Sequence, residues 1–173
     1  PFIKLNNTGP LNFPGTDKAR GVGVNPNRGM WTVKLAYQGS VAHNDSGGNH
    51  GVIGPGGVQW MTAASGVLHK EYHETEFARK GGMFQMVQLW VNLPAAHKMS
   101  APKYQGFSEK DIPTVHLEGA MGHVKVVAGE YKGTQGAADT FTEVHLYNVH
   151  LKEHGIASFS FPAQPNTSVL VLS

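Results

Sequence analysis

The clearest chemistry-bearing pattern in the chain is His69-Lys70-Glu71, an imidazole and a carboxylate separated by one residue. In a β-strand alternate side chains point to one face, so these two would lie about 6.6 Å apart along the strand. Two such pairs on facing strands can converge on one ion through bonds of about 2.0–2.2 Å. Imidazoles and a carboxylate around open positions suit a divalent transition metal that binds oxygen or substrate. His69 and Glu71 have the residue types and the spacing of one such pair.

His73 continues the alternation and would share a strand face with His69 and Glu71. On a straight strand it would lie about 13 Å from His69, so it could bind the same ion only where the chain bends. A helical interpretation would place His69 and His73 one turn apart. However, the order H-x-E-x-H differs from the H-E-x-x-H order of helical zinc sites. We therefore leave His73 outside the predicted ligand set.

Other candidate patterns are weaker. His43, Asp45 and Ser46 are residue types of a catalytic triad, but their adjacency predicts a hydrogen-bonded turn over residues 44–49 instead. The three tryptophans are predicted to be core aromatics. No glycine-rich phosphate-binding motif occurs, so nucleotide binding has no support. The remaining histidines show no ligand spacing and are predicted to be surface or hydrogen-bonded residues: His50, His97, His116, His123, His145, His150 and His154.

Short apolar segments separated by Gly, Pro, Asn and Asp clusters predict the strands that would position these groups. Residues 31–37 alternate between apolar and smaller or polar side chains, so one face of this strand should point to a core. Residues 86–93 are almost continuously apolar, which predicts a strand buried on both faces. One helical turn is predicted at residues 75–80 and a connector at residues 95–113. Further strands are predicted at residues 52–53, 58–61, 124–127, 142–151, 157–161 and 168–172, the last breaking off at Ser173.

Composition bounds the class of protein. Among the 173 residues, 22 Gly and 10 Pro with only 15% charged side chains indicate a turn-rich β protein rather than a helical bundle. The net charge is +2, but Lys and Arg are scattered, so we expect no nucleic-acid partner. Cysteine is absent and no apolar run reaches the ~18 residues of a membrane span. We expect a cytoplasmic protein without membrane association, cut from a longer chain or trimmed at its Pro1 terminus.

Two long blocks carry a resemblance to a known family. The stretches GVIGPGGVQWMTAASGVLHKE from Gly51 and QLWVNLPAAHKMSAPKYQ from Gln88 closely resemble the central signature of pirins. The opening residues and the His43-Asn44-Asp45-Ser46 turn are also similar to the family pattern. The resemblance implies a cupin fold, a double-stranded β-helix barrel in a bicupin arrangement. We expect an N-terminal cupin domain with its connector at residues 1–113 and a partial, incomplete second barrel at residues 114–173.

The resemblance also implies a metal site, commonly for iron, held by three His and one Glu in the N-terminal barrel. His69 and Glu71 match two of these ligands. The other two belong to an H-P-H-R-G-x-E-T-V motif, where this chain has Asn25 and Asn27 in place of both His, and Trp31 in place of Glu. Amide oxygens are poor ligands for iron, copper or zinc. The chain is therefore expected to bind iron or another divalent metal weakly, or to have no cofactor.

Two functions follow as expectations. The first is a degenerate pirin-like bicupin that binds a small molecule or a protein partner without catalysis. The alternative is a metal-dependent dioxygenase of quercetin 2,3-dioxygenase type, in which Glu71 could serve as the base for a substrate hydroxyl. Whether the chain is an enzyme stays open at this point. Loss of two of the four implied ligands favours the first function, because each lost ligand weakens metal binding.

Overall fold

The structure of the chain, a computed structural model, describes residues 2–163 and 166–172. Nearly all of its regular structure is antiparallel β-sheet, which confirms the predicted all-β class. Besides one α-helix, α1 (Thr75–Lys80), the described residues contain three short 3-10 turns, η1 (Ala95–His97), η2 (Glu109–Asp111) and η3 (Glu118–Ala120). The strands are β1 (Phe2–Pro14), β2 (Gly21–Asn27), β3 (Met30–Gln38), β4 (Val41–Asp45), β5 (His50–Ile53), β6 (Val58–Thr62), β7 (Val67–His73), β8 (Gly81–Asn92), β9 (Lys103–Phe107), β10 (Thr114–His116), β11 (Gly122–Ala128), β12 (Glu130–Tyr131), β13 (Thr134–Gln135) and β14 (Leu146–Leu151).

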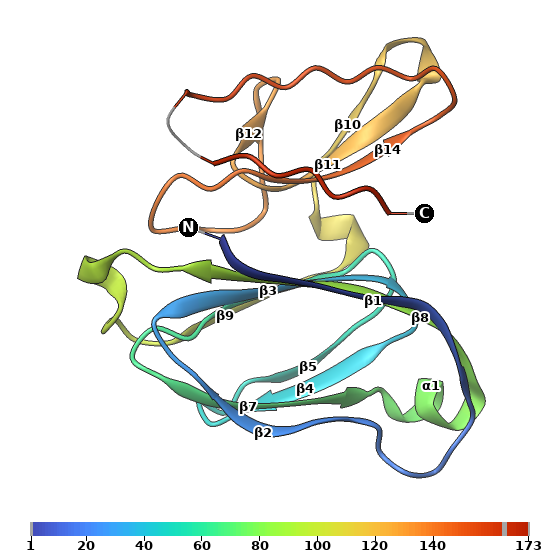
Figure 1. The fold of residues 1–173 in the computed structure, drawn as a ribbon, viewed down its shortest axis with the longest axis vertical. Coiled ribbons are helices and arrows are strands. Elements are labelled where there is room, and N and C mark those ends of the chain that lie inside the picture. The colour runs from blue at the N-terminus through green and yellow to red at the C-terminus, as the bar shows by residue number, and fades with distance from the viewer. Residues whose placement is uncertain (1, 164–165, 173) are drawn as a thin grey trace.

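Two sheets form the part of the molecule that holds His69 and Glu71. One has the strand order β1-β8-β3-β6-β9 and the other the order β2-β7-β4-β5. Figure 1 shows these sheets stacked face to face, with α1 at one end. The strands after the connector, β10 to β14, lie together on the outer side of the five-stranded sheet. The interior between the first two sheets is therefore the place where facing strands could bring side chains together.

Strand β3 is buried on both faces because it lies between two layers. Its apolar set, Trp31, Val33 and Leu35, joins a core cluster that also contains Val127 and Ala128 of β11, which confirms the predicted apolar face. The alternate set, Thr32, Lys34 and Ala36, is 1%, 0% and 3% exposed and points towards the other sheet. This second face holds Lys34, the one lysine of the strand, and the lysine side chain is fully buried.

One large core connects the earlier and later strands. Trp31 and Trp60 are 1% and 0% exposed, as predicted for core aromatics, and their rings meet edge to face with centroids 6.1 Å apart. Val127, Ala138 and Val144 pack in the same cluster. Trp90 differs, since it is half-buried and receives the Lys4 ammonium 4.7 Å from its ring centroid. The domain boundary at residue 113 stays a prediction. The outer ends of the two predicted domains, Pro1 and Ser173, lie outside the described residues.

Several predicted elements differ from the structure. The predicted connector contains strand β9, which pairs with β6. Strand β8 begins at Gly81, earlier than the predicted residue 86. One of its faces is half-buried, whereas both were predicted to be buried. Strand β14 begins at Leu146, later than predicted. Residues 157–161 and 168–172 are not strands. Their alternating pattern does not provide the neighbouring strand with which a strand must form its hydrogen bonds. In that last segment Val169 and Val171 are 88% and 86% exposed. The predicted break at Ser173 lies outside the described residues.

The predicted helical turn is present as α1. Its N-terminus is capped by the Glu74 carboxylate, which accepts hydrogen bonds from the backbone N–H groups of Glu76 and Phe77, both at 3.0 Å. Gly81 ends the helix with φ +70°, and a Cβ there would lie 2.4 Å from the carbonyl oxygen of Phe13. Glycine at this position therefore lets the chain turn directly from α1 into β8.

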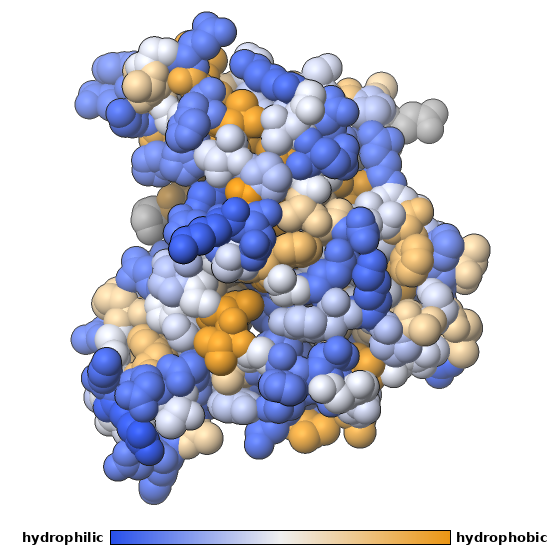
Figure 2. Space-filling model, turned by 180° about the vertical axis from the view of Figure 1, so that it is seen from behind, coloured by the Kyte–Doolittle hydropathy of each residue, from blue (hydrophilic) through white to orange (hydrophobic). Residues whose placement is uncertain are grey.

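The face drawn in Figure 2 has no single dominant patch. Figure 2 shows hydrophilic residues over most of one face, with hydrophobic residues gathered at several separate places. Among the residues that the structure describes, no helix combines the length and apolar character that crossing a bilayer would require.

Candidate functional site

Strand β7 carries the predicted ligand pair on its inner face. Its burial alternates, so His69 and Glu71 are 3% and 8% exposed, while Leu68 and Lys70, which precede them in turn, face solvent. The alternation follows from the two-residue period of a strand that is paired on both sides, with β2 and β4. His69 Nε2 lies 2.7 Å from Glu71 Oε1. The two side chains therefore already contact each other inside the interior.

Lys34 reaches the same point from the opposite sheet. Its ammonium contacts the Glu71 Oε1 atom as an ion pair, and its Nζ lies 3.2 Å from His69 Nε2. Lys34 stands on β3 opposite Gln59 of β6 and Gln88 of β8, which places it on the inner face. The sequence analysis missed this residue, because a lone lysine at an alternating position has the same pattern as a solvent-facing one. Only the second covering sheet distinguishes the two cases.

The two asparagines at the replaced ligand positions are bonded to the protein itself. Asn27 donates through its side-chain amide to Asn25 Oδ1 at 3.1 Å. Asn25 donates in turn to the backbone oxygens of Gly23, at 3.0 Å, and His69, at 3.2 Å. In the register of β2 and β7, Asn25 lies opposite His69. The two strands that carry the ligand positions implied by the family are therefore neighbours. The amides of Asn25 and Asn27 therefore stabilise the β2–β7 pair rather than converging on His69 and Glu71.

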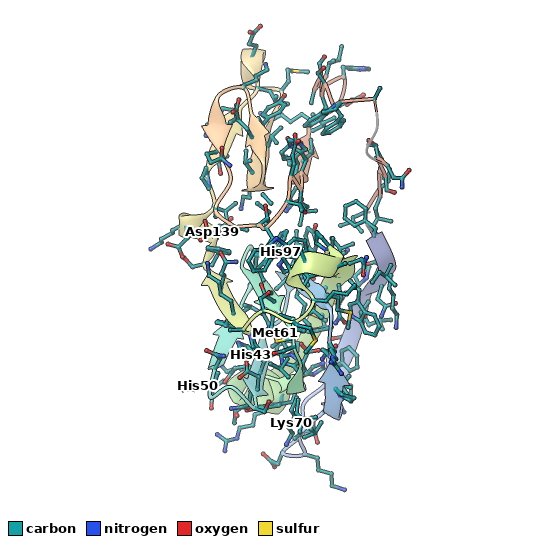
Figure 3. The ribbon with its side chains drawn as sticks, turned by 90° about the vertical axis from the view of Figure 1, so that its left-hand side faces the viewer. His43, His50, Met61, Lys70, His97 and Asp139 are labelled. Atoms are coloured by element: carbon teal, nitrogen blue, oxygen red, sulfur yellow. The ribbon has the colours of Figure 1, made fainter. Side chains whose placement is uncertain are left out.

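His43 and Tyr104 form a second buried pair beside the first. His43 is 1% exposed, and its Nε2 lies 2.6 Å from the Tyr104 hydroxyl oxygen. Its ring also stacks on the ring of His69, with centroids 5.8 Å apart. Figure 3 shows His43 and Met61 inside the two-sheet part and His50 at its edge. No pattern in the sequence indicated this pair, since His43 was assigned to the turn and Tyr104 to the connector.

The turn predicted after His43 is present. Asp45 Oδ1 accepts hydrogen bonds from the backbone N–H groups of Gly47, at 2.8 Å, and Asn49, at 3.0 Å. Ser46 Oγ accepts from the backbone N–H of Leu68 at 3.0 Å. The three triad residue types thus have separate roles, with Asp45 and Ser46 holding the turn and His43 facing the interior.

His73 does not join the site. It is the last residue of the regular strand β7, and its ring lies 4.9 Å from Phe13 and 4.7 Å from Phe84, measured between centroids. The strand does not bend to bring it to His69, which agrees with the exclusion argued from strand geometry. The strand also rules out the helical interpretation of His69 and His73.

Further polar atoms face the same interior without a protein partner. Gln59 is 0% exposed, and neither its side-chain oxygen nor its nitrogen has a hydrogen-bond partner in the protein. The Thr32 hydroxyl and the Nδ1 atoms of His43 and His69 share this property. Buried polar groups are normally hydrogen-bonded, because an unpaired one loses its water without compensation. This interior is therefore chemically suited to a small polar molecule or to water.

Electrostatics in the interior favour neutral bases. Burial lowers the pKa of the Lys34 ammonium to about 7. Burial, followed by the positive charge of Lys34, lowers the pKa of His43 to about 4. The same two causes, in the same order, lower the pKa of His69 to about 3. Both imidazoles are therefore neutral at pH 7.

These shifts predict a loss of stability in mild acid. Between pH 6.5 and about 4 the unfolded chain binds protons at His43 and His69 while the folded chain does not, so the free energy of unfolding falls as the pH falls. At about 1.4 kcal/mol per pKa unit, and with about 2.2 units for each imidazole over this range, we expect a combined loss of about 6 kcal/mol from pH 7 to pH 4. Urea unfolding at pH 7, 5.5 and 4.5 measures it.

The variant His43→Gln should remove about half of this pH dependence, whereas the exposed His154→Gln should leave it unchanged. An unchanged pH dependence in His43→Gln would contradict the assignment.

The residues present do not fit the metal site that the family resemblance implies. An ion bound to both His69 Nε2 and Glu71 Oε1 would need the position that Lys34 Nζ holds against these two atoms. The amides of Asn25 and Asn27 are committed to the protein. Among the described residues, no three His, Asp or Glu side chains are grouped to hold a metal ion.

The remaining histidines lie away from this interior. His116, His123 and His150 stand side by side across β10, β11 and β14, with ring centroids 6.2 and 5.3 Å apart. His97 stacks on Phe141 with centroids 4.3 Å apart, and His145 lies 2.8 Å from both Tyr147 and Glu143. Figure 3 places His97 and Asp139 near the junction with the later strands. Two open grooves lie in this later part. One is lined by residues 129–130, 135 and 138–145, and the other by residues 130–132, 147 and 158–161.

Comparison with known proteins identifies the family. The Pirin family matches residues 1–91. A Pseudomonas aeruginosa protein named "Putative quercetin 2,3-dioxygenase" is 47% identical over 172 residues, covering 99% of this chain and 60% of its own length. A pirin-like protein of Caulobacter vibrioides is 44% identical over 137 residues, covering 79% of this chain and 47% of its own length.

Among solved structures, the crystal structure of a quercetin 2,3-dioxygenase from Acinetobacter baumannii is 51% identical, with a TM-score of 0.82 over 85% of this chain and 51% of that one. The chain thus spans about half to three fifths of the length of these relatives. The matched blocks include both β7, with His69 and Glu71, and β2, with Asn25 and Asn27. The chain belongs to the pirin family.

Proposed function

We propose that this chain is a pirin whose inherited metal site is degenerate and which acts by binding rather than by oxygen chemistry. The observation that carries the proposal is the bonding of the two replaced ligands. Asn27 donates to Asn25, and Asn25 donates to the backbone of β7, so the side-chain nitrogens of both asparagines are bonded to partners other than the His69 and Glu71 side chains. The four-ligand set implied by the family is thereby reduced to two side chains that already contact each other. Such a set binds a divalent metal weakly, if at all.

The ligand that we propose is a small polar molecule in the interior between the two sheets, or a protein partner on the surface. The unpartnered amide of Gln59 and hydroxyl of Thr32 support the first, because they offer both donors and acceptors in a buried place. The hydroxyl of Tyr104, paired with His43, adds a further polar group. The proposal includes a cytoplasmic location and no nucleic-acid partner, as the scattered basic residues suggest.

A second candidate is a metal-dependent dioxygenase of the quercetin 2,3-dioxygenase type. It is supported by the Acinetobacter baumannii quercetin 2,3-dioxygenase, which is 51% identical to this chain with a TM-score of 0.82. In that case Glu71 would be the base for a substrate hydroxyl and His69 a ligand of iron or another divalent metal. We rank it second because its remaining two ligand positions are amides with other partners.

Metal content separates the two functions. Protein purified without added metal, and again after incubation with ferrous, manganous or nickel ions and desalting, is expected to hold below about 0.1 equivalent of metal. Chelator treatment should leave the unfolding temperature unchanged, and quercetin should not be consumed. Near-stoichiometric iron, copper, nickel or manganese, together with quercetin turnover, would instead establish the dioxygenase. Elemental analysis and oxygen uptake are the measurements.

A further inference from the structure

Lys34 is the residue that neither the family resemblance nor the sequence pattern assigns. Its Nζ touches both atoms through which His69 and Glu71 would bind an ion, namely His69 Nε2 and Glu71 Oε1. The side chain is fully buried and enters from β3, on the sheet opposite the ligand strand β7. It therefore crosses the interior from the opposite sheet to reach the two side chains that remain of the implied ligand set.

We propose that the Lys34 side chain takes the place of the metal ion in this chain. A covalently held organic cation then bridges His69 and Glu71 where the family site would hold a divalent ion. This inference rests on the proposed function, because it requires that the inherited site is degenerate. The inference adds that the metal ion has been replaced by the lysine ammonium. Asn25 and Asn27 therefore do not need to act as ligands.

Charge balance supports the exchange. Glu71 is the one acidic side chain within ion-pair distance of Lys34 in the parts of the chain that the structure describes. One ammonium and one carboxylate sum to zero in this buried place. Adding a divalent ion while Lys34 stayed would leave two uncompensated positive charges there, and like charges repel strongly in a medium of low dielectric constant. A metal ion therefore competes with the charged Lys34 side chain for this position.

Packing fixes the lysine in position. Its neighbours across β3 are Gln59 on β6 and Gln88 on β8, and the ring of His43 stacks on that of His69 at the far end. The side chain is 0% exposed, so it has no path to solvent without opening the two sheets. The cation is thus part of the folded interior and is not exchanged with the medium.

The test restores the histidines with and without the lysine. The variants are Asn25→His/Asn27→His, the same pair with Lys34→Gln, and the same pair with Lys70→Gln. Lys70 is the matched control, because it lies between His69 and Glu71 in sequence but faces solvent on β7. Each variant is incubated with nickel or, without oxygen, with ferrous ions. Bound metal is measured by elemental analysis after desalting and affinity by calorimetry, with circular dichroism confirming the fold.

We expect the double variant and the Lys70 control to hold below about 0.1 equivalent, and the triple variant with Lys34→Gln to hold about 1 equivalent at least about 100-fold more tightly. Equal stoichiometric binding by the double and the Lys34 triple variant would overturn the role of Lys34 and leave the proposed function standing. A folded Lys34 triple variant that binds no metal would also overturn it. Stoichiometric binding by the unmodified chain would instead overturn the proposed function itself.

A second measurement keeps the test independent of whether the variants fold. The unmodified chain is labelled with carbon-13 lysine. The Lys34 ε-methylene NMR signal is the one that is missing from the spectrum of Lys34→Gln, and it is also recognised by the chemical-shift change that burial causes. Stoichiometric manganous ion, which broadens signals of nearby nuclei, should leave that signal unchanged. Selective broadening of the Lys34 signal at one equivalent would place a metal beside the lysine and overturn the proposal.

Discussion

Replacing Glu71 by leucine is expected to lower the free energy of unfolding by about 3–5 kcal/mol, since it leaves the Lys34 amine buried without its partner. The cost arises because the amine stays buried after its compensating carboxylate has been removed. Urea unfolding at pH 7 measures the change, and the variant should regain stability as the pH rises towards 9.

The double variant Lys34→Met/Glu71→Leu should recover most of this loss and unfold within about 1–2 kcal/mol of the parent protein. Removing both charges leaves no uncompensated ion, which is the reason for the recovery. The control is Glu76→Leu, which breaks the exposed Glu76–Arg79 ion pair of α1 and should change stability by at most about 1 kcal/mol. If the double variant is as unstable as Glu71→Leu alone, the loss comes from Glu71 packing and not from Lys34.

Replacing Trp60 by alanine is expected to cost about 3–5 kcal/mol, the usual range for deleting a large buried aromatic side chain. The effect should spread beyond β6, because Trp60 belongs to the core cluster that also contains Val33 of β3 and Val127 of β11. Amide hydrogen exchange should therefore quicken at both Val33 and Val127. Denaturant unfolding gives the free energy, and exchange followed by NMR gives the location.

The control for Trp60 is Leu68→Ala on β7, where the leucine side chain is half exposed and the change should stay within about 0.5 kcal/mol. Faster exchange at Val33 alone, with Val127 unchanged, would show that the earlier and later strands do not share one cooperative core. The observed packing predicts the opposite result, since the same cluster contains residues from both.

The sequence alone determined the features that depend on a two-residue period. It placed His69 and Glu71 together on one face of a strand, and the burial of β7 shows that this is the inner face. It also identified Trp31 and Trp60 as core residues and the turn around Asp45, because apolar alternation and turn-forming side chains act over a few residues. The substitutions Asn25 and Asn27 were visible because the residues around them match the family motif.

Only the tertiary structure decided what lies opposite that inner face. Lys34 alternates with apolar neighbours as a solvent-facing residue would, and its burial follows from the second sheet that covers β3. His43 and Tyr104 are 61 residues apart and meet because β4 pairs with β7 while β9 pairs with β6. Residues 157–161 and 168–172 alternate like strands yet have no ladder, since pairing depends on a neighbouring strand that alternation does not encode. Local periodicity fixes which way a side chain points, and long-range packing fixes what it meets there.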